Sequence, residues 1–244
     1  MKHFSVISAN SVLGRSSFSP LLILALLVCA ISGADAQNKR AQLDGVWILS
    51  GSATVEMTLT PAGEAARARY DYLRDDPAMQ CIPASFTRVM HTPSPPIEVR
   101  QHKNEVHINY EFMDIRRRVP IAPGTPLAKA QVSVPKHPHL GRSVARYEGD
   151  VLLIETIGQR AGILDTLGAP GLVQSDQMRT EERFVPDGNR MRVIVTHRDP
   201  VYYAKPLVVT YPYQRLPGGE ILPWECTPEE ASYKRFPIRE KEKK

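Results

Sequence analysis

The sequence predicts a mainly β protein, a single antiparallel β-barrel with one helix near its N-terminus and a short helix near its C-terminus. Short segments of strand-forming residues follow one another from Phe86 to Cys226, separated by clusters of Gly, Pro, Asn and Asp. Helix signals are confined to two places, around Thr60 and around Thr227. Roughly eight to ten strands fit a barrel or a sandwich. Closure favours the barrel, because it leaves no exposed strand edge.

Residues 1–36 have the pattern of a signal peptide. Basic residues precede an apolar run, Leu21–Ala30, and Ala34-Asp35-Ala36 matches a small-x-small cleavage site. The apolar run is too short to span a bilayer, so we expect a secreted or periplasmic protein with no stable membrane anchor. Cys29 raises a lipoprotein alternative, but Val28 stands where a small residue is expected before an acylated cysteine.

Two cysteines, Cys81 and Cys226, remain after cleavage before Gln37. An even number of cysteines in an oxidising compartment predicts a disulfide between them. This disulfide would join an early loop to the last predicted strand. The alternative is a pair of free, buried thiols.

The mature chain is expected to form one domain over residues 37–238, followed by a disordered tail at 239–244. The charge of the whole chain is mild, because 31 Lys and Arg against 26 Asp and Glu give +5. No basic stripe is interleaved with aromatic residues, so we expect no nucleic-acid partner. No nucleotide or phosphate fingerprint is present, and we expect no cofactor.

The first predicted strand carries Gly45-Val46-Trp47. A Gly-x-Trp at this place resembles lipocalin-type barrels, where the tryptophan plugs the closed end, so the barrel is expected to be lipocalin-like or allene-oxide-cyclase-like. The alternative is that Trp47 is an ordinary core residue. Thr60 and Pro61 give the clearest helix start, with Thr as the cap and Pro at the first helical position, and the helix is expected to reach about Leu73.

The next signals are strands, predicted at 86–91, 97–101, 106–112 and 113–121. In the last of these, Ile115, Arg117 and Val119 share one face. Two long loops, at 122–140 and 158–177, flank the following hairpin. Loops of this length in a compact domain are either functional or mobile.

The clearest hairpin spans Gly141–Thr156. A two-residue loop at Gly149-Asp150 would place Tyr147 opposite Leu152 and Ala145 opposite Ile154 on one apolar face. Arg146 and Glu155 would then lie diagonally on the other face, within reach of a salt bridge.

A second hairpin is predicted from Met178–Val185 and Arg190–His197. A two-residue loop at Asp187-Gly188 would set Arg183 opposite Arg192, so a three-residue loop ending at Asn189 is preferred. The remaining strands are expected at 201–203, 207–215 and 221–226. Thr227-Pro-Glu-Glu230 is a capping box that predicts the C-terminal helix.

Several segments resemble a family of secreted proteobacterial β-rich proteins. They are Thr60–Ala66, Asp76–Pro83, Met90-x-Thr-Pro93, Tyr110-Glu111, Gly141–Asp150, Glu181–Phe184, Asp199-Pro200 and Tyr203–Pro206. The usual family form has Trp in place of Tyr147, and Thr-Leu-Val-Val in place of Val151–Ile154. The resemblance implies secretion and a single β-rich domain, and it brings no known catalytic residues.

The ligand-binding candidates are polar and aromatic side chains on predicted strands: Tyr110, Arg116, Arg146, Arg183, Tyr211 and Tyr213. Charges on strands are expensive to bury unless they are paired, so inward carboxylate–Arg pairs could hold a polar ligand. Tyr211 and Tyr213 share a strand face and could form an aromatic wall. The alternative is that the charges face solvent, because small barrels alternate in and out along every strand.

The catalytic candidates are Glu111, Asp114, Glu155, Glu181 and His197. A carboxylate or imidazole whose pKa is shifted by burial could abstract a proton, which would give cofactor-free lyase or isomerase chemistry. Ser143 does not qualify as a nucleophile, because Gly141-Arg-Ser-Val-Ala145 lacks the second glycine of the elbow motif.

His137 and His139 are the only metal-ligand candidates, since alternate residues of an extended chain point to one side. They flank a proline in a loop, and no third ligand stands at a recognisable spacing. We therefore expect no metal site.

No motif names a reaction. The leading hypothesis is a secreted or periplasmic barrel that binds a small, partly apolar molecule. One alternative is a cofactor-free lyase or isomerase with an acid–base pair inside the barrel. Another is an envelope interaction module that uses an outer strand face.

Overall fold

The computed structural model describes residues 42–122, 124, 139–165 and 169–226. These residues belong to one compact unit, Arg40–Lys244. The predicted signal peptide, C-terminal helix and tail lie outside the described residues, as do Cys29 and His137.

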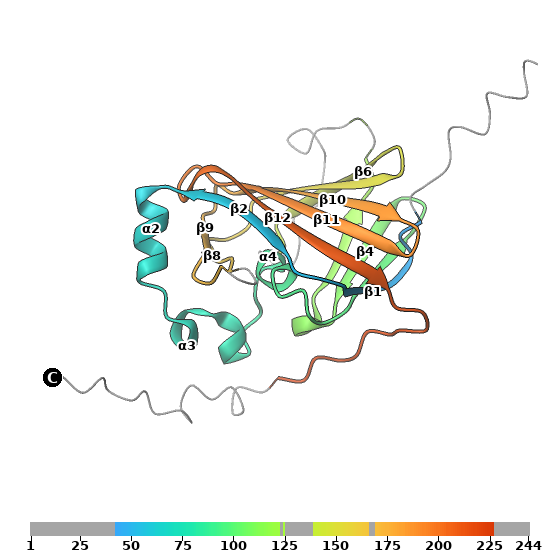
Figure 1. Ribbon diagram of the computed structural model, residues 1–244, viewed down its shortest axis with the longest axis horizontal. Helices are drawn as coiled ribbons and strands as arrows, with labels where there is room; N and C mark the ends of the chain where they lie inside the picture. Colours follow the sequence, from blue (N-terminus) through green and yellow to red (C-terminus); the bar gives the residue numbers. More distant parts are fainter. Residues whose placement is uncertain (1–41, 123, 125–138, 166–168, 227–244) are drawn as a thin grey trace, which may run out of the picture. The chain divides into compact units, whose positions relative to one another are not determined.

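Nine strands form an antiparallel barrel in the order β5-β4-β3-β1-β12-β11-β10-β7-β6 (Figure 1). They are β1 (Gly45–Leu49), β3 (Ile97–Gln101), β4 (Glu105–Tyr110), β5 (Arg116–Pro120), β6 (Arg142–Glu148), β7 (Val151–Ile157), β10 (Arg179–Asp187), β11 (Arg190–Arg198) and β12 (Tyr203–Arg215). The two ends of this order meet at a parallel bridge between Ile121 and Ala145. The Ala122 amide also donates to the Ala145 carbonyl at 2.9 Å. The predicted barrel is therefore confirmed, in a nearly closed, lipocalin-like form.

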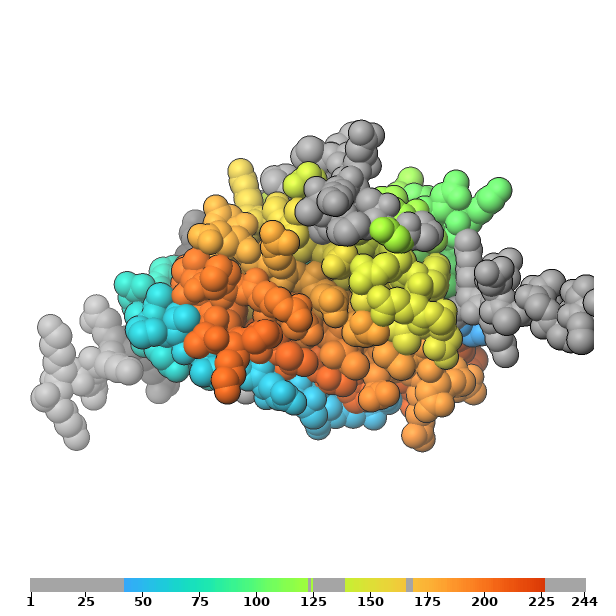
Figure 2. Space-filling model, turned by 90° about the horizontal axis from the view of Figure 1, so that it is seen from above, coloured from blue at the N-terminus to red at the C-terminus, as the bar shows by residue number. Residues whose placement is uncertain are grey.

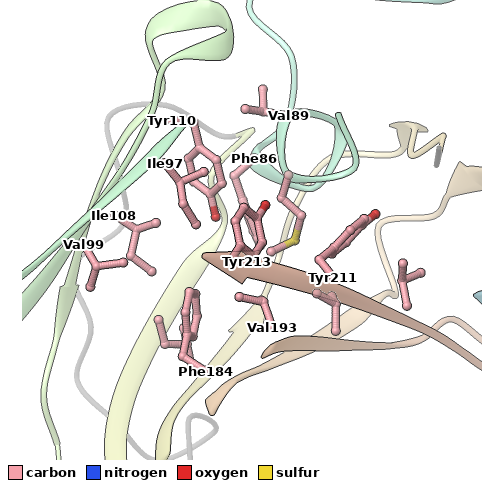
Figure 3. Packing of buried hydrophobic residues seen from close by; sticks show 14 of the residues in the cluster. Phe86, Val89, Ile97, Val99, Ile108, Tyr110, Phe184, Val193, Tyr211 and Tyr213 are labelled. Atoms are coloured by element: carbon pink, nitrogen blue, oxygen red, sulfur yellow. The ribbon is translucent and has the colours of Figure 1, made fainter. Parts of the chain in front are cut away.

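A tenth strand, β2 (Thr54–Leu59), continues the course of β1 along β12. In Figure 2 the yellow and orange atoms of β6, β10, β11 and β12 lie against one another as a wall. The inward residues of the strands form the core, since alternate residues of a strand point to opposite faces. Figure 3 shows Ile97, Val99, Ile108, Phe184 and Val193 packed together in this core.

Trp47 of β1 lies toward the end of the barrel opposite α2, which we call the closed end (Figure 1). It is fully buried, and its indole N–H donates to the Leu43 carbonyl at 2.8 Å. The Arg215 guanidinium stacks over the ring at 4.2 Å and donates to the Asp44 carbonyl. Gly45 has φ +127°, and a Cβ there would lie 2.7 Å from the guanidinium. Trp47 is thus a core residue, and the glycine beside it makes room for the arginine.

The opposite end, which we call the mouth, carries the helices α2 (Pro61–Ala68), α3 (Tyr72–Asp75) and α4 (Phe86–Met90) and the 3₁₀ turn η2 (Pro77–Gln80) (Figure 1). Thr60 caps α2 as predicted, with its hydroxyl accepting from the Gly63 amide at 3.1 Å. The helix ends at Ala68, earlier than the predicted Leu73, and α3 follows as a separate turn.

The strand predicted at 86–91 is wrong, because Phe86–Met90 forms α4. The Ser85 hydroxyl caps this helix by accepting from the Arg88 amide at 3.1 Å. All five helical residues are buried. Burial on every side explains why the segment shows no amphipathic helical pattern.

The two hairpins follow the prediction to different degrees. In β6–β7, Tyr147 faces Leu152 and Ala145 faces Ile154 across the expected Gly149-Asp150 loop. In β10–β11, Asp187 pairs with Arg190, so the loop is the two residues Gly188-Asn189 and the predicted three-residue loop is wrong. The repulsion that motivated the longer loop is still avoided, because Arg183 faces Ile194 and Arg192 faces Val185.

Three further segments differ from the predictions. The strand expected at 113–121 is β5 alone, preceded by the 3₁₀ turn η3 (Phe112–Asp114). The loop at 158–177 contains a small two-stranded sheet, β8 (Gly162–Ile163) with β9 (Val173–Gln174). Residues 221–226 form no strand in the described chain.

The predicted disulfide is present. Cys81 follows η2 directly and bonds to Cys226, with 5.6 Å between the Cα atoms and 145 residues of sequence between them. The bond therefore ties the helical segment at the mouth to the segment after β12.

Candidate functional site in the barrel lumen

A row of polar side chains crosses the mouth half of the lumen. Strand register places Ser143 of β6 opposite Thr156 of β7, Thr156 opposite Thr180 of β10, and Thr180 opposite His197 of β11. Because side chains that face each other across paired strands share a sheet face, all four point inward at one level. These four residues, with Arg117 of β5 and Glu182 of β10, are called the polar layer below.

Arg117 and Glu182 form a two-pronged ion pair inside the barrel. The Nη1 and Nη2 atoms of Arg117 lie 2.9 and 2.8 Å from the two carboxylate oxygens of Glu182. The side chains are only 2% and 0% exposed. Nη1 also donates to the Tyr110 hydroxyl at 3.2 Å, and Nη2 to the Thr156 hydroxyl at 3.4 Å. Burial opposes the charge of Arg117, but Glu182 outweighs it and raises the arginine pKa.

A second chain of polar groups runs from Tyr211 to Thr180. The Tyr211 hydroxyl lies 2.5 Å from Nδ1 of His91, and Nε2 of His91 lies 2.7 Å from Nε2 of His197. Nδ1 of His197 then lies 2.9 Å from the Thr180 hydroxyl. Two neutral imidazoles satisfy the chain, since one can donate from Nε2 while the other accepts. Each ring has a protein partner on both nitrogens.

The two histidines are held neutral by their surroundings. Burial lowers the pKa of His197 to about 3. The pKa of His91 is also lowered, first by burial, then by repulsion between the two rings if both were protonated, and then by the positive charge of Arg88. Burial raises the pKa of the Tyr211 hydroxyl, which stays protonated. At neutral pH the two rings are therefore uncharged and the Tyr211 hydroxyl is protonated.

Helix α4 covers the polar layer from the mouth side. The Arg117 guanidinium lies 3.7 Å over the Phe86 ring, a cation–π contact across the lumen. Figure 3 shows Phe86 near Tyr110 and Tyr213, with Tyr211 farther along the same side. The helix is fastened by Arg88, whose guanidinium donates to the buried Asp76 carboxylate at 2.6 and 3.1 Å.

The predicted site residues divide between the lumen and the outside. His197, Tyr110, Tyr211 and Tyr213 are buried in the lumen, and the structure brings the first three into the two polar chains.

The remaining charged candidates, Arg116, Arg146, Arg183, Glu111, Asp114, Glu155 and Glu181, are exposed or half-buried outside it. The Arg146–Glu155 salt bridge predicted for the hairpin is present at 2.9 Å. Arg183 pairs with Glu148 at 3.1 Å, and Arg116 pairs with Asp114. Glu111 accepts from the Leu222 amide at 3.0 Å.

Among the titratable side chains of the lumen, sequence reasoning missed Arg117, Glu182 and His91. The signal for Arg117 was present, because it shares a strand face with the buried Val119. Glu182 likewise alternates with the inward Thr180 and Phe184. His91 gave no signal, because it follows a helix that the sequence did not predict.

Two hollows among the described residues lie outside the lumen. One of about 580 Å³ opens at the closed end beside Arg100, His102 and Arg215. Another of about 480 Å³ lies beside Arg190, Arg192 and Gln214. Within the described ranges, no three His, Cys, Asp or Glu side chains stand close enough to hold a metal. His139 is described, and its backbone carbonyl accepts from Gln159 at 3.4 Å.

The sequence matches no family model and no curated protein. Solved structures with a similar course of the chain include the fluorescent protein UnaG, at 13% identity and a TM-score of 0.35, covering 72% of this chain and 98% of that one. A secretary abundant heat soluble protein from Ramazzottius varieornatus shows 7% identity and a TM-score of 0.37, covering 75% and 100%. Apo lipid binding protein 8 of Caenorhabditis elegans shows 10% identity and a TM-score of 0.37, and the match covers 73% of this chain and 100% of that one. Similarities of this extent identify no ligand for this chain.

None of the helices in the described ranges has the length and hydrophobicity of a membrane span.

Proposed function

We propose that this protein is a secreted or periplasmic barrel that binds a small, partly apolar molecule in the mouth half of the lumen. The observation that carries the proposal is the fully buried Arg117–Glu182 pair. Replacing a buried ion pair by well-packed apolar residues is often neutral or stabilising. Stability alone therefore does not explain why the lumen contains this pair and a row of hydroxyl groups.

The ligand would occupy the space that α4 fills in the structure. Tyr110, Tyr211 and Tyr213 supply apolar walls, and the polar layer supplies donors and acceptors for one polar group of the ligand. Entry requires α4 to move outward. A helix of five residues has little stability of its own, so its position depends on tertiary contacts that a ligand can replace.

The disulfide supports a location outside the cytoplasm. Cys81 and Cys226 are bonded, and such bonds persist in oxidising compartments. This agrees with the signal peptide expected from the sequence.

Native mass spectrometry of protein purified from the periplasm tests the proposal. We expect an additional mass from a co-purifying small molecule in the wild type. The double variant Arg117→Met/Glu182→Leu, which lacks the ion pair but has a well-packed substitute for it, should lose that mass. The matched control Arg146→Met/Glu155→Leu removes a half-exposed pair of the outer face and should retain it. A ligand-free mass in the wild type, with no binding of an apolar fluorescent probe such as anilinonaphthalene sulfonate, would contradict the proposal and favour an interaction module.

The Tyr211–His91–His197–Thr180 chain favours one second candidate, a cofactor-free lyase or isomerase. A neutral, buried imidazole beside a second polar group is one element of general-base catalysis, and a substrate would have to displace one of the partners that now occupy both ring nitrogens. The test is incubation of the co-purified molecule with the protein in D₂O. Deuterium incorporation that disappears in His197→Gln would support catalysis. No incorporation in the wild type would contradict catalysis and would support a protein that only binds the molecule.

A further inference from the structure

The His91–His197 contact joins α4 to the wall of the barrel. His91 is the residue that ends α4, whereas His197 lies on β11 and is 0% exposed. Their Nε2 atoms face each other at 2.7 Å, and the outer nitrogens are engaged by Tyr211 and Thr180. The contact needs a lone pair on at least one of the two Nε2 atoms. Two protonated rings would set two N–H donors against each other.

We propose that the His91–His197 pair is a proton-operated latch, which holds α4 in the mouth at neutral pH and releases it when both rings are protonated. The inference deepens the proposed function and rests on it in one respect, namely that an open mouth admits the ligand. The opening itself depends only on the contacts of α4.

Among the described residues, no carboxylate contacts either ring of the pair. From α4, Arg88 adds positive charge near His91 and already engages the Asp76 carboxylate. From β10, the Glu182 carboxylate is engaged by Arg117 of β5. On the other sides the pair meets only hydroxyl groups, those of Tyr211 on β12 and Thr180 on β10.

Asp165 is the other carboxylate near this region, and it accepts from the Tyr70 hydroxyl at 3.1 Å. A second positive charge on the pair is therefore stabilised most readily by hydration, which exposes His91 to water. This movement pulls on the last turn of α4.

The pH dependence has a definite sign. In the open state the histidines titrate near the ordinary value of about 6.5, whereas burial keeps them neutral in the closed state to a much lower pH. The open state therefore binds more protons below pH 6.5. Each such proton favours opening by about tenfold per pH unit, so two favour it by about a hundredfold. Above pH 6.5 the equilibrium should not change with pH.

Hydrogen exchange of the mature protein between pH 7.5 and 5 measures the latch. The reporter amides are Val89 and His91, which donate to the Ser85 and Thr87 carbonyls at 3.1 Å. After correction for the intrinsic pH dependence, their protection should be constant above pH 6.5 and fall tenfold to a hundredfold per unit below it. The amides of the paired residues Phe184 and Val193 serve as an internal reference and should stay protected.

Two variants sharpen the test. His91→Gln leaves one titrating ring and should reduce the slope to tenfold per unit or less. His107→Gln removes a histidine on β4 that pairs with Glu105, and it should leave the wild-type slope unchanged. If His91→Gln fails to fold, the pH profile of the wild-type α4 amides, compared with the reference amides, still tests the latch. A flat profile of α4, or equal loss of protection at Phe184, would overturn the latch.

Probe binding separates the latch from the proposed function. Anilinonaphthalene sulfonate should bind more tightly at pH 5.5 than at pH 7.5 if the open mouth leads to a binding lumen. Exchange that opens without any probe binding would support the latch and contradict the proposed function. Probe binding at both pH values with flat exchange would overturn the latch and support the proposed function.

Discussion

At the scale of single residues, the lumen is unusual for the charge it encloses. Arg117 and Glu182 have lost nearly all contact with water, and their own two-pronged contact compensates for this loss. Tyr110 and Thr156 occupy further donor positions of the guanidinium. The intact pair therefore costs little stability, whereas removing one partner should lower the free energy of unfolding strongly.

The ion pair gives a prediction for stability. Glu182→Gln leaves a buried, unpaired guanidinium and should lower the free energy of unfolding by about 3–5 kcal/mol. Arg117→Met/Glu182→Leu should recover most of this loss, because no buried charge remains. Urea unfolding at pH 7.5 measures both, and Glu155→Gln on the outer face should cost no more than about 1 kcal/mol. A double variant as unstable as Glu182→Gln would mean that folding itself requires the pair.

At the scale of elements, α4 is a helix of only five residues with few backbone hydrogen bonds of its own. The Ser85 cap, the Arg88–Asp76 pair and the His91–His197 contact hold it in place. Segments of this kind open locally at a smaller free energy than the whole protein. The barrel wall, with long antiparallel pairs such as β10–β11, belongs to the other extreme.

The cap of α4 can be tested apart from the rest. Ser85→Ala should weaken α4 by about 1 kcal/mol and raise the exchange rates of the Val89 and His91 amides about fivefold. Thr60→Ala removes the matching cap of α2 and should leave these amides unchanged. Equal effects of the two substitutions on α4 would show that the helices do not open independently.

The strands could be predicted from the sequence better than α4. Alternation and turn residues located the β6–β7 hairpin to the residue, because the buried face leaves one register for Tyr147 and Leu152. In β10–β11 the same reasoning chose the wrong loop, since Asp187 remains in the strand and Gly188 turns with φ +57°. Phe86–Met90 consists partly of strand formers and is too short to show a helical period.

The lumen residues show why the charge of a strand residue does not by itself predict whether it faces the lumen or the solvent. Charged strand residues are expected outside, which holds for Arg146 and Glu155. Arg117 and Glu182 break the rule together, and neither is acceptable inside without the other. They lie on strands that are not neighbours in the sheet order, so alternation along either strand alone does not reveal the pair.

At the scale of the whole molecule, the two ends of the barrel are secured differently. The closed end relies on Trp47 and Arg215. The mouth relies on a covalent link, because the Cys81–Cys226 disulfide connects the segment before α4 to the chain beyond β12. A loop of 145 residues is a large part of the unfolded chain to constrain.

Removing the disulfide should destabilise the protein by about 3–5 kcal/mol. The comparison is Cys81→Ser/Cys226→Ser against the wild type in urea, with reduced wild-type protein as the matched control. The two should agree, since both lose the same cross-link. A loss below about 1 kcal/mol would indicate that the denatured chain keeps its ends together without the bond.

The odd number of strands in the barrel has a consequence for how the strands are connected. When every neighbour in a row of nine is antiparallel, the first and last strands run in the same direction, so the pair that closes the ring, β5 and β6, has to be parallel. Strands of one direction cannot be joined by a tight turn and need a connection of about a dozen residues or more. A barrel of nine strands therefore needs the long segment between Ile121 and Arg142, because this segment joins two parallel strands. Shortening it to a hairpin turn would leave an eight-stranded or an open sheet.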